Sequence, residues 1–310
     1  MTTTTRIRTS PARPAAVARR PWWRTRTAAG LAYAAPTAVV VGLLFLAPLG
    51  LVGWMSLNRW PLLGDAEFNA PANYEKVRDD PLFLDAAVFT LKYTVLVTVL
   101  LSAAALGLAL LVQERRRGTG FFRTAYFLPG AVGFAAASLL FYGLYSNEFG
   151  PLDTILQRLR ITDEPVQWIG TPNGALFSTI ALVIWRFAGF NMLILLTGLQ
   201  SIPGELYEAA RVDGASRWQM FRRITLPLLR PTIALMLILS ITGSLLAFDQ
   251  FFILTNGGPD NSTTTLVMVI YRNAFFRFDL GGAAALSVVL LVVLVGLNAL
   301  QLRVLRRGDD

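Results

Sequence analysis

The sequence predicts an all-α integral membrane protein with six transmembrane helices and a short helical segment on one membrane face. Its 310 residues are 54% hydrophobic and only 15% charged, whereas a soluble domain usually carries about 25% charged residues. Six apolar runs also reach the length of about 20 residues that a helix needs to cross a bilayer. They are residues 31–57, 86–112, 124–146, 174–199, 232–254 and 281–304.

Composition excludes several kinds of chemistry. The chain contains no cysteine and no histidine. Disulfides, thiolate metal sites and imidazole ligands or bases are therefore ruled out. We predict no catalytic residue and no metal site.

The first apolar run is predicted to remain in the mature protein. It follows a basic, acid-free leader, but it exceeds the about 7–15 apolar residues of a secretion signal and has no clear small-residue cleavage site. We expect a cytoplasmic leader over residues 1–30, disordered because it is rich in Thr, Pro, Ala and Arg. A transmembrane domain over residues 31–305 and a cytoplasmic tail over 306–310 follow.

Basic residues predict the orientation of the spans. Nineteen of the 28 arginines and lysines lie in the leader, in residues 113–123 and 200–231, and near the C-terminus. The alternate connections, residues 58–85, 147–173 and 255–280, hold 7. Positive charge accumulates on the cytoplasmic side, so both termini are predicted to be cytoplasmic. The net charge of +9 is thus a topology signal and does not indicate nucleic-acid binding.

The cytoplasmic segment 201–227 predicts two short helices joined by a tight turn. Ser201 and Pro203 are typical of a helix start, Gly214 of a break and Ser216 of a second N-cap. The tether between two spans argues against a DNA-binding helix–turn–helix. An interfacial amphipathic helix and a docking surface for a cytoplasmic partner both fit these residues.

The outer connections contain two local features. Residues 151–160 begin with Pro151 and carry apolar residues at helical spacing, which predicts a short amphipathic helix near the outer surface. Gly257, Gly258 and Pro259 are typical of a turn. This turn is either a simple loop or a contact for a partner.

Two charged residues within spans are candidates for function, because charge inside a bilayer is costly. Arg186 lies near the middle of the fourth span and Asp249 toward the outer end of the fifth. We expect them to pair, or to share a polar cavity. A salt bridge that only fixes the helices is the alternative.

Side chains near these charges could line a substrate path. Ser240 and Ser244 are four residues apart and share one face of the fifth span, while Phe187 and Phe190 flank Arg186 on the fourth. The alternative is that each serine bonds to its own helix and each ring faces lipid.

Residues 208–227, EAARVDGASRWQMFRRITLP, resemble the EAA motif of binding-protein-dependent ABC importer permeases. Further stretches resemble the maltose and glycerol-3-phosphate type of sugar permease: RTAYFLPG (123–130), GLQSIPGELYEAARVDGAS (198–216) and GGAAALSVVLL (281–291). FDQFFILTNGGPDNSTTTLVMVIYRNAF (248–275) is similar to the first of that family's two permease subunits. The resemblance runs from about residue 31 to 305.

This resemblance implies a type I ABC importer permease fold and a location in the bacterial inner membrane. It implies a heterodimer with a second, related permease, two cytoplasmic ATPase subunits, and an extracytoplasmic solute-binding protein that delivers a sugar or sugar derivative. Segment 201–227 would be a coupling helix seated in a cleft of an ATPase subunit. Its contact residues would be Glu208, Ala209, Ala210, Asp213, Gly214 and Ala215.

The same resemblance assigns the other candidates. Rings and hydroxyls of the fourth and fifth spans would surround the sugar, and the Gly257–Pro259 turn would contact the binding protein or the partner permease. ATP and Mg²⁺ would be bound by the ATPase subunits, because this chain has no G-x-x-x-x-G-K-[ST] phosphate loop.

Two other classes remain as alternatives. A self-contained secondary transporter or channel normally needs an ion-coupling site or inverted repeats, and the sequence shows neither an acidic cluster within the spans nor obvious halves. A membrane enzyme would have only Arg186 and Asp249 for ionic chemistry at depth.

Overall fold

The computed structural model describes residues 26–114, 117–146 and 150–306. Most of the predicted disordered leader (1–30) and of the predicted tail (306–310) lies outside the described residues. The chain forms two compact units, which divide between Leu51 and Val52.

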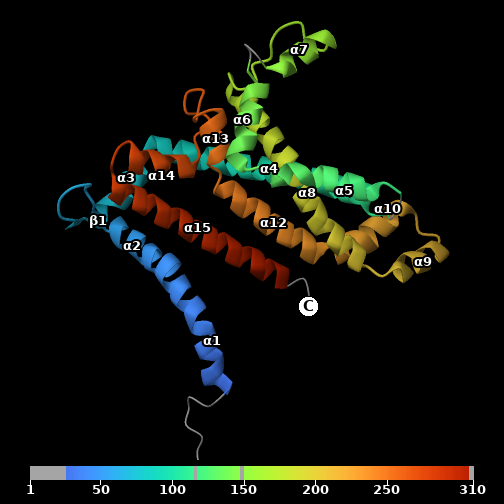
Figure 1. Ribbon diagram of the computed structural model, residues 1–310, viewed down its shortest axis with the longest axis horizontal. Coiled ribbons are helices and arrows are strands. Elements are labelled where there is room, and N and C mark those ends of the chain that lie inside the picture. The colour runs from blue at the N-terminus through green and yellow to red at the C-terminus, as the bar shows by residue number, and fades with distance from the viewer. Residues whose placement is uncertain (1–25, 115–116, 147–149, 307–310) are drawn as a thin grey trace, which may run out of the picture. The chain divides into compact units, whose positions relative to one another are not determined.

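The described part of the N-terminal unit is helical. Helix α1 (Arg26–Val41) continues through the π-helical turn η2 (Gly42–Leu46) into α2 (Ala47–Ser56), which crosses the unit boundary (Figure 1). The predicted span 31–57 falls on these elements. Helix α1 begins at Arg26, so its first residues lie inside the predicted leader.

A small outer structure follows in the second unit. Strands β1 (Asn58–Arg59) and β2 (Glu67–Phe68) pair antiparallel, with Asn58 opposite Phe68. Helix α3 (Ala72–Asp79) comes next. Its buried Asn73 donates hydrogen bonds to the carbonyl oxygens of Ser56 and Asn58 at 3.0 and 2.9 Å, which holds the ribbon to the end of α2.

Long helices form the centre of the second unit. Helix α4 (Pro81–Val112) packs against α8 (Pro172–Ser201), and α15 (Leu280–Arg306) packs against α12 (Arg230–Leu245). N-cap side chains and prolines define where α4 and α8 begin. Asp80 accepts a hydrogen bond from the backbone of Leu82 at 2.9 Å and Thr171 accepts one from Gly174 at 3.1 Å, each with proline at the first helical position.

Among the described residues, four helical stretches are long and apolar enough to cross a membrane, and two bent pairs bring the number to six. The first pair consists of α5 (Thr119–Phe127) with the 3₁₀ turn η3 (Leu128–Ala131), followed by α6 (Phe134–Leu144), and it bends by 96°. The second consists of α10 (Arg217–Met220), η4 (Phe221–Thr225) and α11 (Leu226–Leu228), followed by α12, and it bends by 66°.

Two predicted spans are therefore not single helices. Span 124–146 is interrupted at Val132, which is extended, and at Gly133, which is not helical either. Both follow a proline and a glycine that disfavour a regular helix. Span 232–254 is interrupted after Leu245 and resumes as α13 (Asp249–Leu254). The carbonyl of Ala247, freed by this break, accepts a hydrogen bond of 2.7 Å from the Thr265 hydroxyl.

Three local expectations have clear outcomes. The amphipathic helix predicted at 151–160 is α7 (Pro151–Arg158). The outer connection 255–280 contains a further helix, α14 (Leu266–Phe275), that was not predicted. Ser201 is not an N-cap, because it is the last residue of α8 and its hydroxyl donates to the carbonyl of Gly198 at 2.8 Å.

The core consists of successive apolar clusters along α4 and α8. Tyr93 and Val183 belong to one cluster, whereas Ala105 and Met192, further along the same two helices, belong to the next. The packing opens between these clusters, and the cavity described below lies at that level.

Candidate functional site

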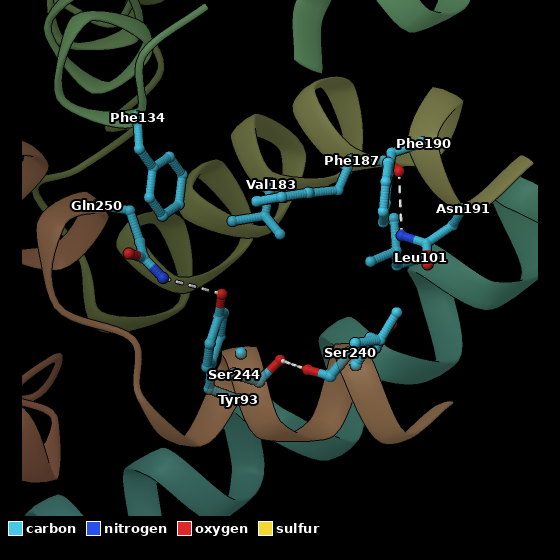
Figure 2. A pocket seen from close by; sticks show the side chains of 12 residues that line it. Tyr93, Leu101, Phe134, Val183, Phe187, Phe190, Asn191, Ser240, Ser244 and Gln250 are labelled. Carbon is cyan, nitrogen blue, oxygen red and sulfur yellow. Dashed lines mark hydrogen bonds between the residues drawn. The ribbon is translucent and has the colours of Figure 1, made fainter. Parts of the chain in front are cut away.

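A cavity of about 140 Å³ lies at the meeting point of five helices, α4, α6, α8, α12 and α13 (Figure 2). Two of these helices, α6 and α13, begin directly after the interruptions described above. Irregular backbone at membrane depth is tolerated where it is buried in protein or lines a cavity. The cavity is lined by Tyr93, Leu101, Phe134, Val183, Phe187, Phe190, Asn191, Leu239, Ser240, Gly243, Ser244 and Gln250.

Aromatic rings line the cavity on more than one side. The rings of Phe134 and Phe187 meet edge to face, with centroids 5.7 Å apart. Tyr93, which lies beside Ser244 in Figure 2, is fully buried and packs edge to face on Phe251 at 4.8 Å. These contacts fix the rings, so the aromatic part of the lining is preformed.

Amides and hydroxyls form the polar part of the lining. The side-chain nitrogen of Asn191 donates to the carbonyl of Phe187 at 3.0 Å, and that of Gln250 donates to the Tyr93 hydroxyl at 3.2 Å. The Ser244 hydroxyl donates to the carbonyl of Ser240 at 2.6 Å. Buried atoms without a partner in the described chain remain on three of these residues: Asn191 Oδ1, Ser240 Oγ and Gln250 Oε1.

Arg186 does not pair with Asp249, so the expected ion pair is wrong. The guanidinium carbon of Arg186 lies 4.8 Å from the ring centre of Phe134 and 4.5 Å from that of Phe187, and Nε donates to the carbonyl of Val132 at 3.1 Å. Aromatic faces and a carbonyl thus replace the carboxylate as partners of the cation. Asp249 is exposed and begins α13, where a helix N-terminus favours negative charge.

The structure brings together four of the predicted path residues. Phe187, Phe190, Ser240 and Ser244 line the cavity, whereas Arg186 and Asp249 do not. The alternative prediction was that each serine hydroxyl bonds to its own helix. The Ser244 hydroxyl does so, whereas the Ser240 hydroxyl does not.

Among the lining residues with hydrogen-bonding side chains, sequence reasoning missed Tyr93, Asn191 and Gln250. A signal for two of them was present. Asn191 and Gln250 are amides within otherwise apolar runs. A search of the spans for uncharged polar side chains, in addition to charged ones, would have found both.

The segment 201–227 forms a second distinct region, away from the cavity lining. Helix α9 (Gly204–Val212) ends in a Schellman motif. Gly214 has a φ of +76°, its N–H donates to the carbonyl of Arg211 at 3.1 Å, and the N–H of Ala215 donates to that of Ala210 at 2.9 Å. The predicted break at Gly214 therefore has a backbone reason, since a left-handed φ favours glycine.

The second helix of the segment starts with a capping box. The backbone N–H of Gln219 donates to the Ser216 hydroxyl at 3.3 Å, and the backbone N–H of Ser216 donates to the Gln219 side chain at 2.7 Å. The N-cap predicted at Ser216 is confirmed. The turn between the two helices is thus defined by bonds within the segment itself.

The candidate contact residues lie on the outside of this turn. Glu208, Ala209, Asp213 and Gly214 are exposed, and Ala210 and Ala215 are half-buried. Apolar side chains accompany them, since Val212 is 88% and Trp218 is 66% exposed.

One side-chain bond connects α9 to the bent helix pair that follows it. The hydroxyls of Tyr207 and Thr225 lie 2.9 Å apart, and Thr225 is buried. Thr225 ends η4, a few residues before the bend into α12, which carries Ser240 and Ser244. The turn is therefore attached to a helix that lines the cavity.

The predicted turn at 257–259 is a compact, hydrogen-bonded loop. Gly257 is buried with a φ of +85°, and the Thr263 hydroxyl donates to the carbonyl of Gly258 at 2.7 Å. Arg272 of α14 donates to the carbonyl of Asn256 and to Oδ1 of Asn261, each at 2.8 Å. Burial of the Arg272 guanidinium and the nearby charge of Arg277 lower its pKa.

Residues 103–308 match the family described as binding-protein-dependent transport system inner membrane component. The chain belongs to this family. It is therefore the transmembrane permease subunit of an ABC importer, a transport component of the inner membrane rather than an enzyme.

Relatives and solved structures agree with this assignment. The permease is 36% identical to the sulfoquinovosyl glycerol transport system permease protein of Agrobacterium fabrum, with 89% of each chain covered. It is 32% identical to the trehalose/maltose transport system permease protein of Thermococcus litoralis, over 89% of this chain and 92% of that one. A chain of a bacterial ABC transporter for the acidic polysaccharide alginate matches with a TM-score of 0.79, 25% identity, and coverage of 92% and 98%.

Proposed function

We propose that this permease pairs with a second, related permease and translocates a sugar or sugar derivative, which an extracytoplasmic solute-binding protein delivers. Two cytoplasmic ATPase subunits, which bind the ATP and Mg²⁺, would drive the cycle. Sugar transport systems among the relatives, including trehalose/maltose and lactose permeases, favour this substrate class.

The observation that carries the proposal is the cavity itself. Its rings suit the C–H faces of a sugar ring, and its amides and hydroxyls suit hydroxyl groups. None of the described residues that line it is charged. An ion-coupled transporter or an ion channel would need charged or ion-coordinating groups at this depth.

The coupling role of segment 201–227 rests on its exposure and shape. A turn defined by local bonds, with exposed carboxylates and exposed apolar side chains, is suited to docking on a protein. Glu208 and Asp213 would meet basic groups of the ATPase subunit. Ala209, Ala210 and Ala215 would allow close approach, and Gly214 would set the bend.

Orientation and docking can be tested together, because the chain has no cysteine. Val212→Cys in the segment and Leu63→Cys in the outer connection are both highly exposed, at 88% and 92%. A membrane-impermeant maleimide should label Leu63→Cys in intact cells and Val212→Cys only after permeabilisation. The Val212 variant should crosslink to the ATPase subunit. Labelling of Val212→Cys from outside would refute the orientation.

Transport should be tested with the complete importer in proteoliposomes, with ATP inside and the co-encoded solute-binding protein outside. Radiolabelled maltose, trehalose and lactose are the neutral probes, and glucuronate and glucose 6-phosphate the acidic ones. ATP-dependent accumulation of at least one probe supports the proposal. Accumulation by this permease alone without ATP would instead indicate a self-contained transporter.

The outer loop around Gly257 would be a contact surface for another protein of the importer. Gly257 is buried, so contact with the binding protein or the partner permease would be made by its more exposed neighbours, Gly258 and Pro259. Pro259→Cys offers a crosslinking position for that contact.

A further inference from the structure

We infer that the chain carries a binding surface for anionic phospholipids of the inner leaflet, where it leaves the turn around Gly214 and enters the membrane. The surface consists of residues 217–230, from α10 to the start of α12. Its ligand lies outside the proposed transport function, because it is a component of the membrane and not the transported solute. The leaflet follows from the proposed orientation of the spans.

The surface carries positive charge that the described part of the chain does not neutralise. Residues 214–231 contain four arginines and no acidic residue. By contrast, the exposed Arg78 pairs with Asp79 at 3.0 Å. Among the described residues, no group hydrogen-bonds to the side chains of the four arginines and no carboxylate pairs with them. All four are exposed: Arg217, Arg222, Arg223 and Arg230. Such a concentration of unpaired cations favours an anionic ligand.

Exposed apolar side chains lie among these cations. Trp218 is 66% exposed and stacks on Phe221, with ring centroids 5.6 Å apart. Leu226 and Leu228, further along the same surface, are 37% and 48% exposed. Tryptophan and arginine next to leucine are typical of a segment that lies at the boundary between lipid and water. The composition therefore suits the headgroup level of a bilayer.

The course of the chain places this surface at such a boundary. Arg217–Leu228 and Arg230–Leu245 are together apolar enough to form one bent span. Arg230 is the first residue of α12, so the cations lie where the regular part of the span begins. In the proposed orientation this is the cytoplasmic end. Anionic lipids of the inner leaflet attract basic segments that adjoin a span.

Charge separates this surface from the part of the segment proposed to dock on the ATPase subunit. All carboxylates of the cytoplasmic segment precede Gly214. Arg217 also lines a hollow of about 850 Å³, and Glu114 is a further lining residue there. Arg222 and Arg223 do not line this hollow. These two arginines are therefore the centre of the lipid site, and they are the residues to change in a test.

A local fluorescent probe can test the site, because the chain has no cysteine. Leu228→Cys is labelled with bimane in the complete importer, whose other subunits are made free of reactive cysteines. The complex is placed in phosphatidylcholine nanodiscs that contain either brominated phosphatidylglycerol or brominated phosphatidylcholine, at the same molar fraction. Bromine quenches the label only at close range. The difference between the two quenching curves thus measures the preference for an anionic headgroup at this position.

We expect brominated phosphatidylglycerol to quench the label more strongly than brominated phosphatidylcholine. Each arginine near the surface contributes about fivefold to this preference, which corresponds to ~1 kcal/mol. Arg222→Gln combined with Arg223→Gln should therefore lower it by up to about thirtyfold, whereas the corresponding Lys pair should keep it, since lysine binds phosphate as a point charge. Arg78→Gln is the matched control. It removes an exposed arginine that already has a carboxylate partner, and it should leave the preference unchanged.

Equal quenching by the two lipids would overturn the inference, as would a preference that survives the paired Gln substitution. A label that neither lipid quenches, with a crosslink from Leu228→Cys to the ATPase subunit, would assign the surface to that protein instead. Maleimide labelling of Val212→Cys checks that the Gln pair has not reversed the orientation. None of these results bears on the transported solute, because the label reports lipid contact and not uptake.

Discussion

Arg186 gives the sharpest prediction, because its contacts allow the opposing energies to be compared. Each of its two ring contacts is worth about 1–2 kcal/mol in a desolvated setting, and the charged hydrogen bond to Val132 about 1.5–3 kcal/mol. Placing an arginine near the centre of a span costs about 2.5–3.5 kcal/mol. At mid-range values the favourable contacts exceed this cost by about 2 kcal/mol, so Arg186→Ala should lower stability by about 2 kcal/mol.

Transport should fall as well as stability. Phe134 and Phe187 both line the cavity and both lie against the guanidinium, and the carbonyl of Val132 lies at the break between η3 and α6. Without Arg186, the two rings and the Val132 carbonyl lose the side chain that contacts all three. We expect the maximal uptake rate to fall about fivefold or more, since an interaction of ~1 kcal/mol at the cavity is worth about that factor.

The assay compares Arg186→Ala with Arg186→Lys, in proteoliposome uptake and in thermal unfolding of the purified complex. Lysine keeps the charge but lacks the planar fork that stacks and donates through Nε, so its uptake should be intermediate. Wild-type uptake in Arg186→Ala would refute the positioning role. Rescue of Arg186→Asp by Asp249→Arg would also contradict it, because the structure contains no bond between the two residues.

Three further changes test the coupling segment and the helix packing. Gly214→Leu forces a side chain into a left-handed backbone, at about 1–3 kcal/mol, and places bulk on the docking face; ATP hydrolysis should continue while uptake falls, and unchanged uptake would count against docking. Tyr207→Phe and Thr225→Val each remove the 2.9 Å bond and should lower uptake per ATP hydrolysed, with the double variant no worse than either single one; additive losses would mean that the bond is not the shared cause. Gly189→Ala would press a methyl group into the backbone of Tyr126 on α5 and should destabilise the complex by about 1–3 kcal/mol, whereas Gly107→Ala meets no atom within 4 Å and should be neutral or slightly stabilising; equal melting temperatures would contradict the close approach of α5 and α8.

The features that sequence predicted well are those decided by nearby residues. The turn at Gly214 and the cap at Ser216 depend on bonds that span only a few residues, so their residue types are informative on their own. The long apolar helices likewise follow from composition, since each must satisfy its backbone internally in lipid.

The features that sequence did not predict depend on distant contacts. Arg186 was expected to need a carboxylate, but its partners are two rings and the carbonyl of Val132, 54 residues away. A search for residues of opposite charge does not find aromatic rings or backbone carbonyls as partners. The breaks at Val132–Gly133 and after Leu245 occur within continuous apolar runs, where hydropathy alone indicates an unbroken helix.

The hydroxyl of Thr265 has a consequence for how the outer surface communicates with the cavity. It donates to the carbonyl of Ala247 at the broken span and, as N-cap of α14, accepts from the N–H of Met268 at 3.3 Å. The Thr265 hydroxyl thus connects the start of α14 to the backbone between α12 and α13, a few residues before Gln250. A protein that binds this loop from outside would therefore act on the cavity-lining Gln250 through a short stretch of backbone, without first moving a whole span.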